Sequence, residues 1–408
     1  MELARAPGAL LTRTSPERHA VTEPLAYPHF TDEDLQFRES ARRFAQEKLA
    51  PFIDRLPEAA LSRAVLLDLL RLVRPFGILG ASVPAREGGD ELTFTQLGFL
   101  YELFPPEVAM IASTSDLNAF RLVEADEALR RRYLPGILAG ETLVASAISE
   151  PDAGSDISAI RTRAVDNGSH FVVNGQKVWS SAGDVADILV AAVSFGKDAR
   201  GRSIVGRLLV DKRESTVTTR VLPMLGLRRH AMAEIFFEDC VVPKANLIGA
   251  PGDGDKALGR SWLSHRVYIG LIAVNLAQQA LDRSLAHAKL RAQFGRPIGA
   301  NQLIQSMLVD MSVAVETSRF LCYRALHALD RGQESRYASS IAKLQATEAA
   351  VKVTSQAIQI HGAAGLSTEV GLEKLHRDAR MLTIPDGTSE IQRLIAGREL
   401  VGINAIRG

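Results

Sequence analysis

Asp386 is an acidic side chain whose chemistry depends on its setting. It is followed by Gly387, Thr388 and Ser389, ahead of the last helical stretch of the chain. A carboxylate there can cap the helix, and a capping carboxylate is a poor base because backbone N–H groups stabilise its charge. In a desolvated pocket it is instead a good general base. His265 is a lone histidine in a helical stretch, and such a residue can be structural, a neutral base or a hydrogen-bond donor.

Several other kinds of chemistry lack their signatures. The nine histidines are scattered and form no H-E-x-x-H or comparable set, so no metal site is expected. A Walker loop, a G-x-S-x-G motif and a G-x-G-x-x-G motif after a strand are all missing, which argues against phosphoryl transfer, serine esterases and Rossmann-type dinucleotide binding. Cys240 and Cys322 lie far apart in the sequence, which favours reduced thiols in a cytoplasm-like compartment.

The charge balance names no partner. Lys and Arg number 48 against 47 for Asp and Glu, so no strong field draws the protein to nucleic acid or to an anionic membrane. The longest apolar runs are shorter than the ~20 residues of a membrane span. Residues 1–27 are expected to be a flexible arm. A mitochondrial presequence is the alternative, and its glutamates count against it, so we expect a cytoplasmic protein rather than one of the mitochondrial matrix.

The elements that position these residues follow from hydrophobic periodicity. Thr31-Asp32-Glu33-Asp34 is a capping sequence ahead of an apolar helical face. Further helices are predicted at 61–76, 94–103, 125–138, 258–292, 301–331, 335–360 and 373–383. Asn174-Gly175 is typical of a type I′ turn, which predicts a hairpin between strands 170–173 and 176–179. Further strands are predicted at 186–194, 203–210, 216–222 and 232–238.

This order predicts an α+β fold in three domains. Residues 28–145 form an N-terminal helical domain, residues 146–255 a small β-barrel or β-sandwich domain, and residues 256–408 a C-terminal four-helix bundle domain.

Five segments, read in order, resemble the acyl-CoA dehydrogenase family. They are AISEPDAGSD at 147–156, NGQKVWSSAG at 174–183, LGLR at 225–228 leading to FFEDCVVP at 236–243, RAQFG at 291–295, and QIHGAAG at 359–365 followed by RDAR at 377–380 and DGTSEIQ at 386–392. The resemblance extends over about residues 30–405 and agrees with the predicted domain order. It implies an acyl-CoA dehydrogenase-like fold and FAD-dependent oxidation of an acyl thioester, carried either by CoA or by an acyl-carrier protein.

The central segments are the ones that the resemblance assigns to FAD. It implies that Ile148, Ser149 and Ser155 line the cofactor, that Trp179 packs against the flavin, and that Ser181 lies beside flavin N5. A flavin needs hydroxyl and backbone donors at its edge and an apolar group on one ring face, which these residues offer. Without the motif, Trp179 would be a core residue and the serines turn or strand-edge residues.

The resemblance also implies a homo-oligomer, expected to be a tetramer. In the family FAD contacts a neighbouring subunit, and Arg291, Phe294 and Gln359 are the groups implied to reach it. The alternatives are a cation at a helix C terminus for Arg291 and a surface residue before a Gly-rich helix end for Gln359. Thr388 and Glu390 resemble further FAD contacts, although Glu390 can also stabilise the start of a helix.

The base position departs from the family pattern. Asp386 takes the place of the usual Glu before Gly-Thr, and Pro385 replaces the common aromatic residue. Asp is one methylene shorter, and a misplacement of about 1 Å can cost ~100-fold in rate. His265 occupies the position of a second base found in some members. The base and cap interpretations of Asp386 both stay open.

The substrate is expected to contact Gly387, Arg266 and Arg121. Arg266 matches the arginine of the family, whereas Arg121 and His230 depart from its pattern and point to a polar or carboxylated acyl group. Reduced FAD would pass electrons to an electron-transfer flavoprotein or to oxygen. The alternative functions are a related flavin monooxygenase or biosynthetic tailoring oxidase, and a non-catalytic helical oligomer.

Overall fold

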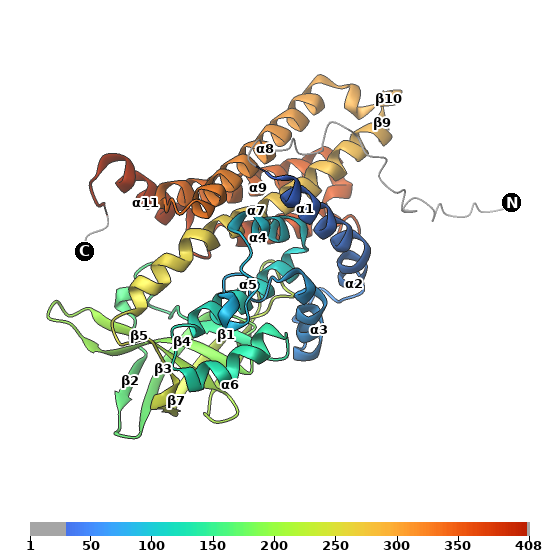
Figure 1. The fold of residues 1–408 in the computed structure, drawn as a ribbon. Coiled ribbons are helices and arrows are strands. Elements are labelled where there is room, and N and C mark those ends of the chain that lie inside the picture. The colour runs from blue at the N-terminus through green and yellow to red at the C-terminus, as the bar shows by residue number, and fades with distance from the viewer. Residues whose placement is uncertain (1–29, 406–408) are drawn as a thin grey trace.

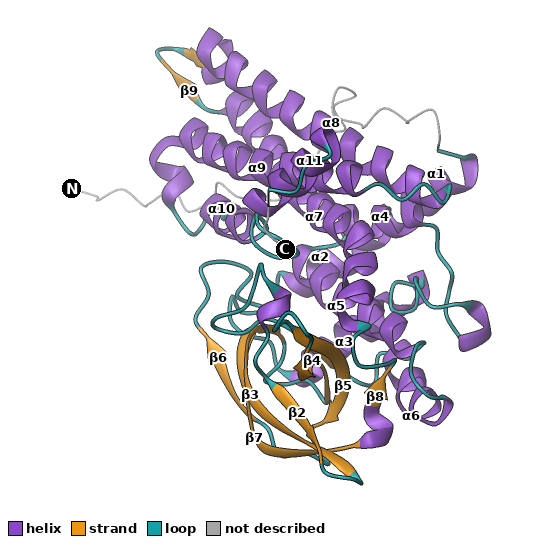
Figure 2. Ribbon diagram, turned by 90° about the vertical axis from the view of Figure 1, so that its left-hand side faces the viewer, coloured by secondary structure: helices purple, strands orange, loops and turns teal. Residues whose placement is uncertain are grey.

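The computed structural model describes residues 30–405, except for the side chains of residues 254–260. The predicted arm, residues 1–27, lies outside this range. Helices from both ends of the chain pack together, and a curved sheet lies on one side of them (Figures 1 and 2). The predicted α+β order of helices, sheet and helices is confirmed, while the domain boundaries stay predictions. Within residues 30–405, none of the helices has both the length and the apolar character of a membrane span.

The N-terminal region is helical. Its helices are α1 (Asp32–Phe44), α2 (Ala50–Ile53), α3 (Arg63–Val73), α4 (Phe94–Leu103), α5 (Pro106–Leu122) and α6 (Glu127–Leu138), with the π-helical segment η1 (Ala45–Leu49) and the short 3₁₀ segments η2 (Arg74–Phe76) and η3 (Ala85–Glu87). The predicted capping box starts α1: the Thr31 hydroxyl accepts from the Asp34 amide over 3.1 Å, and the Asp34 carboxylate accepts from the Thr31 amide over 3.0 Å.

Helix α5 is the longest element that the predicted helices and strands leave out. It is buried nearly all round, so its sequence shows no apolar stripe. Buried polar residues, among them Ser115, Asp116 and Asn118, further mask it. It packs against β1 (Val144–Ala147), α6 and α7 (Gly254–Leu290). A helix between the sheet and the C-terminal helices is well placed to contribute side chains to a site there (Figure 1).

The central region is an eight-stranded sheet with strand order β6-β7-β3-β2-β4-β5-β8, and β1 pairs in parallel with β4. After β1 come β2 (Arg163–Asp166), β3 (His170–Ser181), β4 (Ile188–Lys197), β5 (Ser203–Asp211), β6 (Thr218–Leu222), β7 (Met232–Pro243) and β8 (Leu247–Ile248), with 3₁₀ segments η4 (Ile157–Ala159) and η5 (Lys244–Asn246). Side chains of β4 alternate between two buried clusters: Leu189 and Val193 belong to one, while Ile188 and Val190 contact residues of α5 and α6 in the other.

The predicted hairpin at Asn174-Gly175 is wrong. Those two residues lie inside β3, where the pairing with β7 shifts register between Val173 and Gly175. The hairpin joins β2 to β3 instead, through Asn167 and Gly168, a second Asn-Gly pair whose glycine has a φ of 82°. Gly175 has a different reason for being glycine, since a Cβ there would come within 2.6 Å of Thr162.

The C-terminal region is a helical bundle. Its helices are α7, α8 (Gln302–Asp330), α9 (Arg336–His361), α10 (Leu372–Met381) and α11 (Ser389–Val401), with the two-stranded β9 (Ala292–Gln293) and β10 (Arg296–Pro297) and the 3₁₀ segments η6 (Ile298–Ala300) and η7 (Gly362–Leu366). Helices α7, α8 and α9 pack on one another, and α10 and α11 pack on α9. Buried Ala342, Ala346 and Ala350 repeat every turn of α9, which allows close helix approach.

Candidate active site

The loop after β1 is tied to β3 by hydrogen bonds. The Val178 amide donates to the Ser149 carbonyl over 2.9 Å, and buried Lys177 donates to the Ile148 carbonyl over 2.9 Å. Lys177 also pairs with Glu150 at 2.8 Å. Burial lowers the pKa of Lys177 to about 8, and the Glu150 carboxylate opposes that shift. Ile148 and Ser149 are therefore fixed at the edge of the sheet beside the end of β3.

Trp179 and Ser181 lie at the same end of β3. Trp179 is 57% exposed, so its interpretation as a core residue is wrong. Its φ of 62° is unusual for a bulky side chain, and such strain clusters at functional sites. The Ser181 hydroxyl donates to the Met232 sulfur over 3.6 Å. We call Ile148, Ser149, Trp179 and Ser181 the sheet-edge cluster.

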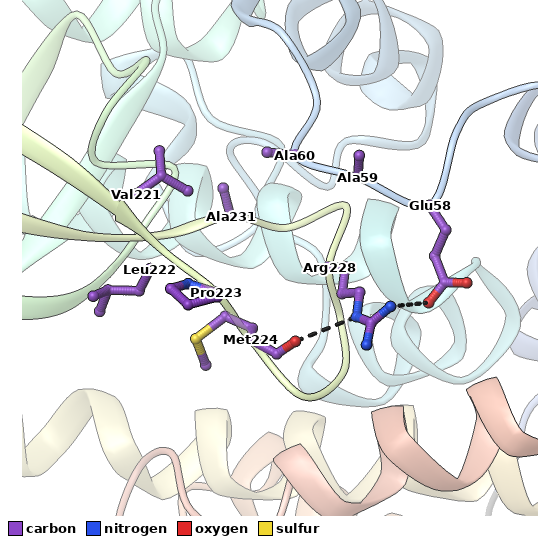
Figure 3. A pocket seen from close by; sticks show the side chains of 9 residues that line it. All are labelled: Glu58, Ala59, Ala60, Val221, Leu222, Pro223, Met224, Arg228 and Ala231. Atoms are coloured by element: carbon purple, nitrogen blue, oxygen red, sulfur yellow. Dashed lines mark hydrogen bonds and ion pairs between the residues drawn. The ribbon is translucent and has the colours of Figure 1, made fainter.

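A groove of about 310 Å³ lies between residues 58–60 and the segment that joins β6 to β7 (Figure 3). Its lining residues are Glu58, Ala59, Ala60, Val221, Leu222, Pro223, Met224, Arg228 and Ala231. The Ala231 carbonyl accepts from the amide of Ala182, the residue after Ser181, over 2.7 Å. Arg228 lies 3.9 Å from Glu58 and donates to the Met224 carbonyl over 3.3 Å. No predicted site residue lines this groove, which extends apolar surface outward from Ser181.

Asp386 does not cap α11. The N-cap is Thr388, whose hydroxyl accepts from the Ile391 amide over 3.4 Å. The cap alternative for Asp386 is therefore wrong. Asp386 is partly buried and has a φ of 55°. Aspartate is one of the few side chains that tolerate this left-handed backbone.

Three buried side chains hold the backbone around Asp386. Arg266 on α7 donates to the Asp386 carbonyl over 3.1 Å. Gln392 on α11 donates to the same carbonyl over 3.1 Å and to the Gly387 carbonyl over 2.9 Å. Lys343 on α9 donates to the carbonyls on either side of Asp386. The aspartate is thus positioned by donors from three helices.

Lys343 and Gln392 are functional candidates that sequence reasoning missed. Lys343 is 1% exposed. Burial lowers its pKa to about 8, and the Asp386 charge opposes that shift. The signal that could have found it is a lysine on the alanine-rich, buried face of a helix, where a charge needs a specific partner. Gln392 carries no comparable signal.

The charge of the Asp386 carboxylate affects the pKa values of side chains on α4, α5 and α7. Burial lowers the pKa of Arg121 to about 10 and that of His265 to about 4, and the Asp386 charge opposes both shifts. Burial also raises the pKa of Tyr101, and the Asp386 charge adds to that rise. The predicted residues Asp386, His265, Arg266 and Arg121 are therefore brought together.

Arg121 links this interior to the sheet edge. Its Nη1 atom donates to the Asn118 side-chain oxygen over 3.1 Å and to the Ser146 hydroxyl over 3.0 Å. The Ser146 carbonyl in turn accepts from the Ser180 hydroxyl over 2.8 Å, one residue before Ser181. Arg121 thus lies between the sheet-edge cluster and the Asp386 charge.

His265 is neutral around pH 7. Its Nδ1 atom lies 3.2 Å from the Ser113 hydroxyl, and its ring meets Tyr268 edge to face at 5.7 Å. A neutral imidazole can donate or accept a hydrogen bond, so the base, donor and structural interpretations of His265 all stay open.

His230 lies in the loop before β7. Its ring is buried, neither nitrogen has a hydrogen-bond partner among the described residues, and burial lowers its pKa to about 4 against the opposing charge of Glu107. Arg229 pairs with Glu107 at 3.0 Å and anchors the loop.

Arg291, Phe294 and Gln359, here called the distal set, lie apart from the sheet-edge cluster. They are exposed at the β9–β10 end of the bundle, opposite the sheet (Figures 1 and 2). Phe294 is 100% exposed and has a φ of 52°, which makes it a second bulky residue with strained backbone. Ser155 is exposed on the loop between β1 and β2. None of these side chains is buried in the chain itself.

Glu390 lies on the surface in the first turn of α11. It lines a pocket of about 230 Å³ together with Arg380, Glu348, Val351, Thr383, Ile384 and Ser389. Its pKa is lowered by a backbone hydrogen bond and by the Thr388 hydroxyl. Thr388 and Glu390 therefore share the start of α11, and both the helix-stabilising and the cofactor-binding interpretations of Glu390 remain predictions.

Comparison with known families decides the affiliation. The N-terminal, middle and C-terminal domain models of acyl-CoA dehydrogenase match residues 31–141, 145–240 and 252–401. The chain belongs to the acyl-CoA dehydrogenase family. The predicted family is therefore confirmed, as is the prediction of a flavoprotein oxidoreductase of the type that acts on CH–CH bonds.

Related proteins match over nearly their whole length. Cyclohex-1-ene-1-carbonyl-CoA dehydrogenase of Geobacter metallireducens is 34% identical over 381 residues, which cover 91% of this chain and 99% of that protein. Butyryl-CoA dehydrogenase from Megasphaera elsdenii superposes with a TM-score of 0.83 at 28% identity, over 91% of this chain and 99% of that one. The prolyl acyl carrier protein oxidase AnaB superposes with a TM-score of 0.82 at 27% identity, over 91% and 100%.

Proposed function

We propose that this protein oxidises an acyl thioester between its α and β carbons, with Asp386 as the base that removes the α proton. One observation carries the proposal: the Asp386 backbone is held by Arg266, Lys343 and Gln392, while its carboxylate acts on the interior side chains rather than capping α11. A base held in this way can be kept near one substrate carbon, which is worth large factors in rate.

The residues at the sheet edge fit FAD. A flat aromatic cofactor needs an apolar ring beside hydroxyl groups, and the strained, exposed Trp179 lies near Ser149 and Ser181. When bound, FAD supplies a two-electron acceptor at its N5 atom for the hydride from the β carbon. In the proposed reaction Asp386 gains the α proton, and the C–H bonds broken at the two carbons leave a C=C bond in the product.

The supporting residues have separate tasks. Lys343 and Arg266 fix the loop through backbone carbonyls. Neutral His265 and the Ser113 hydroxyl offer hydrogen bonds inside the site. The remaining assignments, Gly387 as a substrate contact and Thr388 and Glu390 as cofactor contacts, belong to the same proposal.

The proposal is tested by anaerobic mixing of the FAD-loaded protein with a panel of acyl thioesters. Loss of the visible flavin band with formation of the α,β-unsaturated thioester is the expected result. A colourless protein that takes up no FAD, or a loaded protein that no acyl thioester reduces, would contradict it. A hydroxylated product with oxygen consumption would favour the monooxygenase alternative.

The similarity to a prolyl acyl carrier protein oxidase favours a second candidate, in which the thioester is on a carrier protein and oxygen accepts the electrons. Matched CoA and carrier-protein thioesters separate the two. Reoxidation by oxygen, compared with reoxidation by an electron-transfer flavoprotein, identifies the acceptor.

The distal set supports assembly as part of the proposal. Arg291, Phe294 and Gln359 would contact the FAD of a second copy, which gives these exposed side chains a partner and makes the protein a homo-oligomer, with a tetramer expected. Light scattering of the FAD-loaded protein measures the assembly, and a monomer that retains FAD would contradict it.

A further inference from the structure

The Arg121 guanidinium is buried without an anion. It is 3% exposed, and its Nη2 atom has no hydrogen-bond partner among the described residues. Its contacts through Nη1 are to the neutral groups of Asn118 and Ser146. Burial lowers its pKa to about 10, the nearby Arg207 charge adds to that shift, and the Asp386 and Glu124 charges oppose it. Burying an unpaired cation costs stability, so a ligand that supplies the missing anion is expected.

The nearby carboxylates do not fill this need. Glu124 is already paired with Arg207. The Asp386 charge acts on two further buried cations as well, Arg266 and Lys343, which donate to the backbone carbonyls around it. One carboxylate is thus shared among three cations. A site with excess positive charge attracts an anionic group and gives no such attraction to a neutral group.

The walls around Asp386 are also polar. The buried hydroxyls of Tyr101 and Tyr268 lie beside Ser113 and Ser264, but these contacts lack full hydrogen-bond geometry. Neutral His265 adds a further polar group. A plain hydrocarbon chain would leave such groups unpaired, which is costly in a buried site.

We propose that Arg121 binds a carboxylate on the acyl group itself, so that the substrates are short acyl thioesters with a second acidic group rather than unsubstituted fatty acyl thioesters. The inference rests on the proposed function, because it places this acid in the site of Asp386. The free Nη2 atom donates to the substrate oxygen, while Nη1 stays bonded to Asn118 and Ser146.

The test compares chain-matched thioesters that end in a carboxylate or in a methyl group, such as glutaryl-CoA and valeryl-CoA. Wild-type protein is expected to prefer the acid-ended thioester by about 100-fold in kcat/KM for flavin reduction, the scale of a buried charge-assisted hydrogen bond. Arg121→Met abolishes the preference, and Arg121→Lys keeps part of it. Arg131→Met, at a side chain that is 79% exposed on α6, is the matched control and keeps it fully.

Binding of unreactive thioether analogues gives a readout without turnover. If acid-ended and methyl-ended analogues bind wild-type protein equally, the inference is overturned, whether or not flavin is reduced. Flavin reduction by both thioesters at equal rates overturns it while leaving the proposed function intact. An acid-ended analogue that binds tightly without reducing flavin supports the inference and counts against the proposed function. Unchanged preference in Arg121→Met, with an altered flavin potential, assigns Arg121 to the cofactor and overturns the inference.

Discussion

The sheet-edge cluster is fixed by contacts within the chain, whereas the distal set lies exposed at the other end of the bundle. Val178 and Lys177 hold the segment of Ile148 and Ser149, and donors from three helices hold Asp386 nearby. Phe294, by contrast, is 100% exposed on a strained turn. One region is held by contacts within the chain, and the other is exposed to solvent. We expect the first to control the chemical step and the second to control cofactor retention.

The largest expected effect is on the chemical step. Asp386→Asn should slow flavin reduction by ~10²- to 10⁴-fold, because a positioned general base contributes on that scale. FAD content should not change. Glu399→Gln, at an exposed acid on the same helix as Gln392, is the control. A folded, FAD-loaded Asp386→Asn protein that is reduced at the wild-type rate would remove Asp386 from the reaction.

The next effect tests the loop clamp. Lys343→Met removes the donor to the carbonyls beside Asp386 and should slow flavin reduction by roughly 10- to 100-fold, because displacement of a reacting group by about 1 Å has this scale. FAD binding and the pH profile should keep their form. Lys352→Met, at an exposed position on the same helix, should be silent. An unaltered rate in Lys343→Met would show that the loop is held well enough without it.

The distal set should behave in the opposite way. Arg291→Ala combined with Phe294→Ala should speed FAD dissociation by about 10-fold, the scale of one or two lost contacts, and leave the reduction rate of the loaded protein unchanged. Dissociation is measured by the rise of free flavin fluorescence on dilution. Lys289→Ala, at an exposed lysine of the same region, is the control. If the double variant retains FAD normally, the comparison between the two regions fails.

A separate effect concerns stability rather than rate and depends on pH. Burial lowers the pKa of His265 and His230 from 6.5 to about 4 in the folded protein. Between pH 6.5 and pH 4 the unfolded chain binds more protons than the folded protein. The contribution of the neutral histidines to stability is therefore fully present above pH 6.5 and is lost as the pH falls toward 4. Each histidine lowers the free energy of unfolding by up to roughly 3 kcal/mol at low pH. The midpoint temperature of thermal unfolding should therefore be lower at pH 4.5 than at pH 7.

His230→Leu should reduce that loss, because it removes one buried ring that takes up a proton on unfolding. The leucine forfeits no hydrogen bond, since neither ring nitrogen has a partner among the described residues. His170→Leu, at the first residue of β3, is the matched histidine-to-leucine control. Equal slopes for wild-type protein and His230→Leu would mean that His230 is not buried as a neutral ring.

The sequence pattern was enough for the order of helices, sheet and helices. The motifs named Ile148, Ser149, Trp179 and Ser181, which lie together at one end of β3, while their cofactor roles stay predictions. Helix α5 was not predicted, since a helix that is buried on nearly every side shows no apolar face with a period of 3.6 residues. The turn at Asn174-Gly175 was wrong because an identical dipeptide stands at Asn167-Gly168, and local turn chemistry does not choose between them.

The clamp on Asp386 could not be read from sequence for a different reason. Lys343 and Gln392 donate to backbone carbonyls rather than to a complementary side chain. Such contacts depend on how three helices meet and leave no charge pair to recognise. The capping alternative for Asp386 failed because Thr388, two residues later, is the N-cap.

Ser146 joins the two parts of the candidate active site through one residue. Its hydroxyl meets Arg121 and Asn118 on α5, and its carbonyl accepts from Ser180 on β3. Thermodynamic linkage is reciprocal, so a ligand that restrains Arg121 also restrains the sheet edge, and a bound cofactor restrains Arg121 in return. Substrate and FAD should therefore each slow the release of the other, and protein purified with an unreactive acid-ended thioether analogue should keep its FAD longer.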